Sequence, residues 1–133
     1  MKHRAVATWH VKTWDEQTYK ELDNEGKLTK VAVTSAIHGD IEGESTLEYL
    51  MVYPDDQTAT YIGLEHIEGQ IAGRSGSFVL QHSGAFKDGV ATSTWFVVPN
   101  SGRGELRGLR GAGGSAVQHS EQTPSGTLEY EFE

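Results

Sequence analysis

Residues 41–53 read Ile-Glu-Gly-Glu-Ser-Thr-Leu-Glu-Tyr-Leu-Met-Val-Tyr, and apolar and polar side chains alternate along most of this stretch. One face would carry Leu47, Tyr49, Met51 and Tyr53, and the opposite face Glu42, Glu44, Thr46 and Glu48. A period of two residues is that of a β-strand with one face in a core and the other in water. The stretch therefore predicts a half-buried strand.

The same period recurs on both sides of this stretch. Residues 127–132 repeat it cleanly, and further strands are predicted at 5–12, 28–37, 58–69, 73–84, 90–98 and 104–111. Turn-forming residues separate these segments, at 23–26, 38–40, 54–56, 87–89, 99–102 and 124–126. Residues 15–22 favour a helical turn, and residues 116–120 fit either a short extra strand or the end of a long one.

The fold class that this pattern predicts is all-β, with one domain over residues 1–133. Long strands with short connections favour a closed antiparallel barrel of about eight strands, mostly up-and-down. Glycines inside the expected strands (Gly43, Gly63, Gly76 and Gly108) would let a twisted sheet curl until its edges meet. An open sheet with bulges at these glycines is the alternative.

Composition excludes several classes of function. The net charge is −8, with 19 acidic and 11 basic residues, so neither nucleic acid nor an anionic membrane is an expected partner. The chain has no cysteine, which removes disulfides and thiolate chemistry and fits a reducing compartment. No signal peptide or apolar membrane span is recognised, so a cytoplasmic location is expected.

Three segments carry a family resemblance: 61–65 (Tyr-Ile-Gly-Leu-Glu), 69–84 (from Gly-Gln-Ile-Ala to Gln-His-Ser-Gly) and 94–111 (from Thr-Trp-Phe-Val to Gly-Leu-Arg-Gly). They resemble a bacterial family of small proteins of unknown function whose fold is similar to the eight-stranded barrel of plant allene oxide cyclase. The resemblance runs from about residue 34 to the C-terminus. Allene oxide cyclase closes a ring in a fatty-acid epoxide inside an apolar cavity, so the resemblance implies a pocket in the barrel.

Glu65 is the first candidate for chemistry. It shares a predicted strand face with Tyr61, Gly63 and Ile67, which would place a carboxyl group in an apolar interior. Such a group can serve as an acid or a base. The alternatives are an outward-facing glutamate near a strand end and an ion pair with an arginine.

His82 is the second catalytic candidate, because it shares a face with Phe78 and Leu80 and imidazole exchanges protons near neutral pH. The alternative is a hydrogen-bonded core or rim histidine. Trp95 and Tyr61 are expected to line a ligand site; together with Trp9, Trp14, Tyr49 and Tyr53 they would form either core filler or a cavity wall.

Arginines in the family-like segments are the remaining candidates for ligand binding. Arg74 and Arg107 could each offer a planar fork to a ligand carboxylate. Arg107 and Arg110 are three residues apart, so in one strand only one of them can point inward. The alternative is an ion pair with Glu65 or Glu105.

No cofactor or metal is expected from the motifs. The segment 102–108 lacks the dinucleotide-binding spacing, and no P-loop or nucleophile elbow occurs. The six histidines are scattered and show no zinc-binding pattern.

Three hypotheses for function remain open. The protein binds a small apolar or amphipathic ligand, or it is a cyclase or isomerase that uses a carboxylate such as Glu65, or it is a structural or partner-binding module with a filled interior. A homo-oligomer is also expected, since segments such as 95–98 (Trp-Phe-Val-Val) are apolar on both faces.

Overall fold

A computed structural model of the chain describes residues 2–23, 26–118 and 125–133. The described residues form nine strands: β1 (His3–Glu21), β2 (Lys27–Gly39), β3 (Ile41–Tyr53), β4 (Ala59–Ile71), β5 (Arg74–Lys87), β6 (Val90–Val97), β7 (Arg103–Gly104), β8 (Leu109–Gln118) and β9 (Ser125–Phe132). Within these ranges no helix meets the length and apolarity that a membrane crossing demands.

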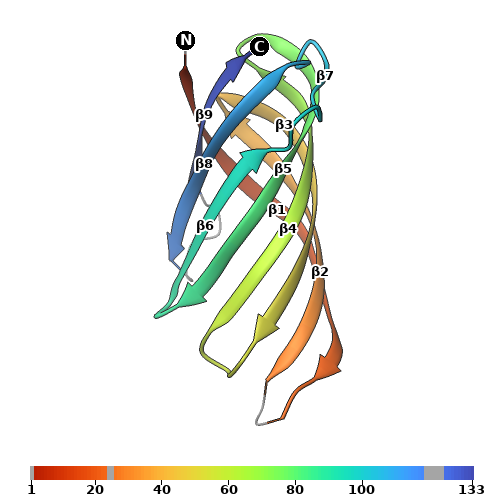
Figure 1. The fold of residues 1–133 in the computed structure, drawn as a ribbon, viewed down its shortest axis with the longest axis vertical. Helices are drawn as coiled ribbons and strands as arrows, with labels where there is room; N and C mark the ends of the chain where they lie inside the picture. The colour runs from red at the N-terminus through yellow and green to blue at the C-terminus, as the bar shows by residue number, and fades with distance from the viewer. Residues whose placement is uncertain (1, 24–25, 119–124) are drawn as a thin grey trace.

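Eight of the strands close into an antiparallel up-and-down barrel (Figure 1). Each strand of the ring pairs with its neighbour along the chain, with β8 following β6, and the pairing of β1 with β9 completes the circle. The two-residue strand β7 lies outside this ring and pairs with β5. The prediction of a closed barrel of about eight strands is confirmed, and closure leaves the ring without unpaired edges.

The expected helical turn at 15–22 is wrong, because β1 continues as a strand to Glu21. Its pairing with β2 runs from Ala7 to Glu21 and is interrupted by two irregularities, where Lys12 and Tyr19 have no counterpart on β2. Each extra residue bends the strand and reverses which side chains point inward. The pairing with β2 therefore overrides the local sequence pattern.

The expected strand at 104–111 is also wrong over its central half, residues 105–108. Residues 105–108 form a turn, in which the amide of Leu106 donates to the carbonyl of Arg103 and the amide of Arg107 to that of Gly104. Gly108 has a φ of 85°, which glycine adopts readily and which ends the turn before β8 begins. Gly108 is thus a turn residue and not a bend within a strand. Leu106, at the centre of this turn, is completely buried.

The other boundaries agree more closely with the sequence pattern. Asp88 and Gly89, with φ of 54° and 79°, form the tight β5–β6 hairpin that the Asp-Gly pair predicts. Residues 116–118 prolong β8, which favours the long-strand interpretation of that segment. Asn24, Glu25 and residues 119–124, which include parts of two predicted turns, lie outside the described residues.

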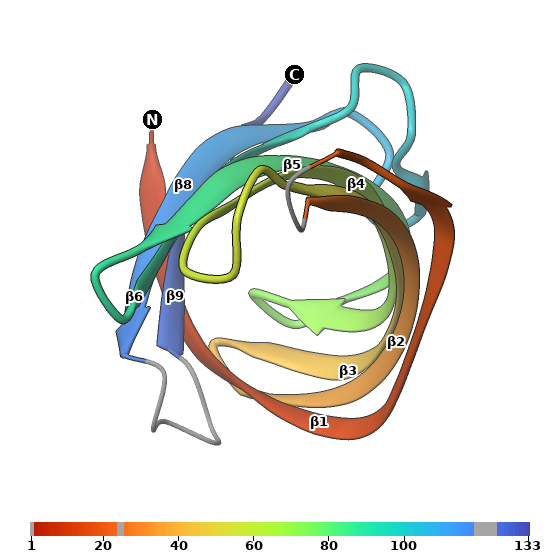
Figure 2. The same cartoon turned by 90° about the horizontal axis from the view of Figure 1, so that it is seen from below.

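The barrel interior has two parts. One end, which we call the closed end, contains the chain termini and β7 (Figure 1). It is filled by a buried aliphatic and aromatic cluster that includes Ile37, Ile41, Ile67, Ile71, Phe78, Leu80, Val97, Leu106, Leu109 and Leu128. The opposite end, which we call the open end, carries the β3–β4 and β5–β6 turns, and Figure 2 looks into it along the ring of strands. A smaller buried cluster there consists of Val31, Val33 and Leu47.

Candidate functional site

The open end of the barrel contains a cavity of about 950 Å³. This volume falls near the upper end of the range of about 300–1,000 Å³ that is typical of small-molecule sites. Its apolar lining comes from seven of the eight strands of the ring: Trp9, Val11, Trp14, Val33, Leu47, Tyr49, Met51, Tyr53, Ala59, Tyr61, Phe86, Ala91, Trp95 and Val117. The turns at 54–58 and 87–89 contribute Asp56, Gln57, Thr58, Lys87, Asp88 and Gly89 to the rim. The interior of the barrel is therefore not filled at the open end.

Glu65 lies where the filled part of the interior meets the cavity. In its row across the sheet it stands between Leu47 of β3 and Leu80 of β5, and its exposed fraction is 1%. One carboxylate oxygen accepts a hydrogen bond from the Trp9 indole at 2.9 Å, and the other lies 2.8 Å from Nε2 of His82. The sequence left an inward and an outward position open for this side chain; the structure has it inside, and its partners are a tryptophan and a histidine rather than an arginine.

His82 is held between Glu65 and two aromatic rings. Since a carboxylate oxygen only accepts, Nε2 carries the proton of the bond to Glu65. The other ring nitrogen, Nδ1, is buried and has no hydrogen-bond partner among the described residues. Tyr49 meets the imidazole edge-on at 5.9 Å between ring centroids, and Trp95 lies at 5.2 Å. These contacts restrict the imidazole to one orientation.

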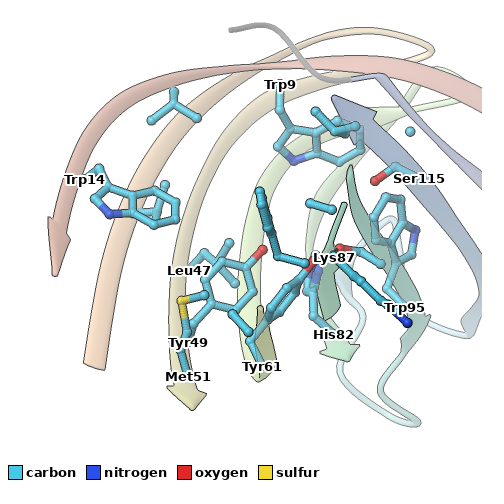
Figure 3. Close-up of a pocket in the computed structure, with 18 of the residues that line it drawn as sticks. Trp9, Trp14, Leu47, Tyr49, Met51, Tyr61, His82, Lys87, Trp95 and Ser115 are labelled. Carbon is cyan, nitrogen blue, oxygen red and sulfur yellow. Dashed lines mark hydrogen bonds between the residues drawn. The ribbon is translucent and has the colours of Figure 1, made fainter. Parts of the chain in front are cut away.

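The aromatic side chains around the cavity are in contact with one another. Ring centroids are 5.7 Å apart for Trp9 and Trp95, 5.0 Å for Tyr49 and Tyr61, and 6.5 Å for Trp14 and Tyr49. Figure 3 shows these rings, with His82, gathered around one space from five different strands. We call the set Trp9, Trp14, Tyr49, Tyr61, His82 and Trp95 the aromatic arc.

Three glycines make room for this arc: Gly63, Gly126 and Gly84, whose added Cβ would lie 2.6 Å from the Tyr61 ring. A Cβ atom at Gly63 would lie 2.7 Å from the Tyr49 ring, and one at Gly126 would lie 2.6 Å from the Trp95 ring. Side chains larger than hydrogen at these positions would displace the rings into the cavity. The sequence pattern marks Gly63 as a bend point, but it contains no signal for this close approach.

Hydrogen bonds fix the remaining rings. The Trp95 indole donates to the carbonyl of Thr127 at 3.1 Å, and the hydroxyl groups of Tyr61 and Ser93 are 2.5 Å apart. Burial raises the pKa of the Tyr49 hydroxyl, and the nearby charge of Glu65 raises it further. Tyr49 therefore remains a neutral phenol, which can donate a hydrogen bond within the cavity.

The tryptophan at position 14 reaches the cavity because of the bulge at Lys12. Trp9 and Trp14 are five residues apart and would face opposite sides of a regular strand. The extra residue reverses the alternation, so that both line the cavity, with Trp14 half exposed at the open end. Sequence periodicity gives no sign of such a reversal.

A second carboxylate lies beside the open end. Glu16 accepts hydrogen bonds from Tyr53 (2.6 Å), Thr29 (2.8 Å) and Trp14 (3.2 Å). Burial raises the pKa of Glu16, but these bonds and the charge of Lys27 lower it more, so its pKa lies below the usual value. The sequence gives no sign that Glu16 lies beside a cavity, because it falls in the segment that favours a helical turn.

The arginine candidates lie away from the cavity. Arg74 is exposed and stacks over the Phe132 ring, 4.0 Å from its centroid. Arg107 is exposed on the turn that precedes β8, and Arg110 pairs with Glu131 at 3.2 Å on the outer surface. Of the predicted ligand-binding residues, the structure brings together Tyr61, Glu65, His82 and Trp95 and leaves out Arg74 and Arg107. Neither of the ion pairs expected for the arginines, with Glu65 or Glu105, is formed by them in the described part of the chain.

No group of three or more metal-ligating side chains gathers within the described residues. Both carboxylate oxygens of Glu65 take part in hydrogen bonds, one with Trp9 and one with His82. The arrangement is an apolar cavity with a few fixed polar groups at one end. Sites for small organic molecules are typically built in this way.

The fold and the cavity define this chain as a small antiparallel β-barrel protein with one filled end and one hollow end. The chain belongs to a family described as a protein of unknown function (DUF3224), whose model matches residues 5–132. The family resemblance found in the sequence is thereby confirmed, and it extends further towards the N-terminus than the segments that revealed it.

One solved structure is similar over the whole chain. It is the crystal structure of a protein of unknown function from the DUF3224 family of Shewanella oneidensis MR-1, 28% identical, with a TM-score of 0.85. The similarity covers 100% of this chain and 99% of that one. The curated proteins contain no match.

Proposed function

We propose that this protein binds a small apolar or amphipathic molecule in the open end of its barrel. The observation that carries the proposal is the cavity of about 950 Å³ with its largely aromatic lining. Apolar surface that a ligand removes from water against such a lining is the main source of affinity in sites of this kind. The few polar groups, Glu65 and His82 among them, would fix its orientation.

The cavity wall is supported in a way that favours binding over collapse. Trp95 is anchored to the backbone of Thr127, Tyr61 to Ser93, and Trp9 to Glu65. A ligand then needs to order few side chains, and less of the binding free energy is lost as conformational entropy. A third hypothesis, a module with a filled interior, finds no support at this end of the barrel.

The first test is native mass spectrometry of gently purified protein, in which a retained small molecule appears as an added mass that is lost on denaturation. Substitution of Ser115, which lines the cavity, by Phe should reduce this retention by filling the space. Ala116→Phe is the matched control, since the neighbouring side chain is exposed. Equal retention by wild type and Ser115→Phe would contradict the proposal.

The second candidate function is a cyclase or isomerase that resembles allene oxide cyclase. The pairing of Glu65 with His82 at 2.8 Å in a buried site favours it, because such a pair can transfer a proton within an apolar cavity. Glu65→Gln separates the candidates: turnover of a retained ligand should collapse in an enzyme, whereas binding should largely survive in a carrier. Unchanged turnover would remove Glu65 from any catalytic role.

The outer surface supports self-association. Leu50, Ile62, Leu64 and Phe96 are 43–58% exposed, and Leu50 pairs directly with Ile62 across β3 and β4. We infer that this apolar face meets a second copy of the chain. Sedimentation should give an oligomer at micromolar concentration, and Ile62→Lys should shift it towards the monomer. A wild-type monomer throughout that range would contradict the inference.

A further inference from the structure

The charges around the cavity are unbalanced. Among the described lining residues three carboxylates, Glu65, Asp56 and Asp88, face one ammonium group, that of Lys87. Asp56, Asp88 and Lys87 are all exposed on the rim turns, where water and salt screen them. Glu65 is 1% exposed, so its charge acts through a region of low dielectric constant and is screened least. The deep part of the cavity therefore has a negative potential.

The aromatic arc adds to this potential. The face of an aromatic ring is the negative part of its quadrupole, and Trp and Tyr attract cations most strongly. Trp9, Tyr49, Tyr61 and Trp95 line the cavity around one space (Figure 3), and Glu65 lines the same cavity. Tyr49 remains an uncharged phenol, so its ring contributes to the arc without adding a local negative charge.

The carboxyl group of Glu65 has no lysine or arginine beside it, and its ion-pair partner among the described residues is the imidazole of His82. Its two oxygens accept from the neutral Trp9 indole and from His82, and no Lys or Arg among the described residues pairs with it. Two donors leave further lone pairs on the carboxylate, and attraction through the cavity requires no direct contact. A cation in the cavity would place a permanent positive charge near this carboxyl group.

From these observations we propose that the cavity selects an organic cation, an amine or quaternary ammonium group carried on an apolar body. The inference rests on the proposed function and names the class of ligand. The cationic group would lie among Trp9, Trp95, Tyr49 and Tyr61 near Glu65, and the apolar body would extend towards Trp14 and Met51. An anionic ligand would meet Glu65 at the bottom of the cavity and would be repelled.

The test compares small aromatic probes that differ in charge. Benzyltrimethylammonium and its carbon isostere 2,2-dimethylpropylbenzene have the same shape, and 3-phenylpropionate supplies the anion. All three tryptophans of the chain line the cavity, so quenching of intrinsic fluorescence reports occupancy there, with calorimetry as an independent measurement. We expect the cation to bind about tenfold more tightly than the isostere, as desolvated cation–π contacts allow. The anion should bind most weakly.

Two variants locate the origin of this preference. Glu65→Gln keeps the shape of the side chain and should reduce the preference to about threefold or less, since only the aromatic contribution remains. Glu48→Gln changes the net charge equally but on the exposed outer face of β3, and it should leave the preference unchanged. Thermal melting of both variants checks that they are folded.

The outcomes separate the two proposals. If the neutral isostere binds as tightly as the cation, or the anion binds best, cation selection is overturned and a ligand-binding cavity stands. If none of the probes binds by fluorescence or calorimetry, both proposals fail for ligands of this size. If Glu48→Gln lowers the preference as much as Glu65→Gln does, the selectivity arises from net charge and not from the cavity.

Discussion

The two ends of this barrel use the same strands and the same alternation, but their inward positions are occupied differently. At the closed end β4 presents Ile67 and Ile71 and β5 presents Phe78, all at most 1% exposed and packed together. At the open end the same two strands present Gly63 and His82, within the wall formed by the aromatic arc. Aliphatic side chains interdigitate across a narrow barrel and fill it. Large rings opposite glycines cover the wall and leave the centre empty.

This difference shows that polarity patterning decides which side chains face inward, whereas the sizes of facing residues decide whether the inside is filled. The difference also separates the part of the molecule that stabilises the fold from the part that contains the cavity. The closed end supplies most of the dense aliphatic packing, and the open end holds the cavity and the buried polar groups. Substitutions at the two ends should therefore have separable effects on stability and on binding.

The largest expected effect is at the closed end. Phe78→Ala removes a ring that is 1% exposed and should lower the free energy of unfolding by about 3–5 kcal/mol. Trp14→Ala removes a larger ring that is half exposed at the open end, and it should cost about 1 kcal/mol or less while weakening ligand binding. Urea unfolding measures both. Equal losses of unfolding free energy for Phe78→Ala and Trp14→Ala would show that side chains at the two ends contribute equally to stability.

A smaller loss is expected at the boundary between the two ends. Glu65→Gln retains one acceptor but faces two donors, so a buried donor loses its partner at a cost of about 1–3 kcal/mol. Glu48→Gln, on the exposed face of the neighbouring strand, should change the free energy of unfolding by about 0.5 kcal/mol or less. A Glu65→Gln protein as stable as wild type would mean that the hydrogen bonds to Trp9 and His82 contribute little.

Much of this division could be predicted from the sequence. Alternation groups Leu47 with Tyr49, Tyr61 with Glu65, and His82 with Leu80 on shared strand faces, because these residues lie in regular stretches of strand. Turn signals such as Asp88-Gly89 fix the hairpins, so the up-and-down order follows from short connections. These features depend on residues close together in the chain.

The features that could not be predicted depend on residues far apart. Trp9 and Glu65 are separated by 56 positions, and their hydrogen bond exists only because the barrel closes. The place of Trp14 depends on a bulge against β2, and the need for glycine at 126 depends on the Trp95 ring of another strand. Arg74 and Arg107 looked like ligand-binding groups because side-chain chemistry alone does not reveal which end of a strand faces a cavity.

The glycine at 126 offers a finer comparison of the two ends. Its hydrogen faces Trp95 and Trp9, so Gly126→Ala should push both rings towards the cavity and cost about 1–2 kcal/mol. Ligand affinity should fall as well, because the rings then occupy part of the site. Glu129→Ala, at an exposed position of the same strand, should change neither property appreciably. Unaltered binding by Gly126→Ala would show that the rings can move without consequence for the cavity.

The smallest expected effect is a response to acid at the open end, from Glu16. Burial raises the pKa of this group, but its three hydrogen bonds and Lys27 lower it more, so the folded pKa lies below the usual value of 4.5. A carboxyl group of this kind stabilises the fold fully above its unfolded pKa, and the contribution disappears as the pH falls through the folded pKa. We therefore expect the wild type to lose stability below about pH 4.5, and Glu16→Gln to lose less over the same interval.

Urea midpoints measured across that interval give the comparison. Glu42, Glu44 and Asp55 also have lowered pKa values, but they are present in both proteins and cancel in the difference. What remains belongs to Glu16 and its bonds to Trp14, Thr29 and Tyr53. Tryptophan fluorescence should detect the change first, because Trp14 is one of these partners and lines the cavity. Parallel pH curves for the two proteins would mean that this cluster does not stabilise the open end, and that the strands β1 and β2 are held there by backbone pairing alone.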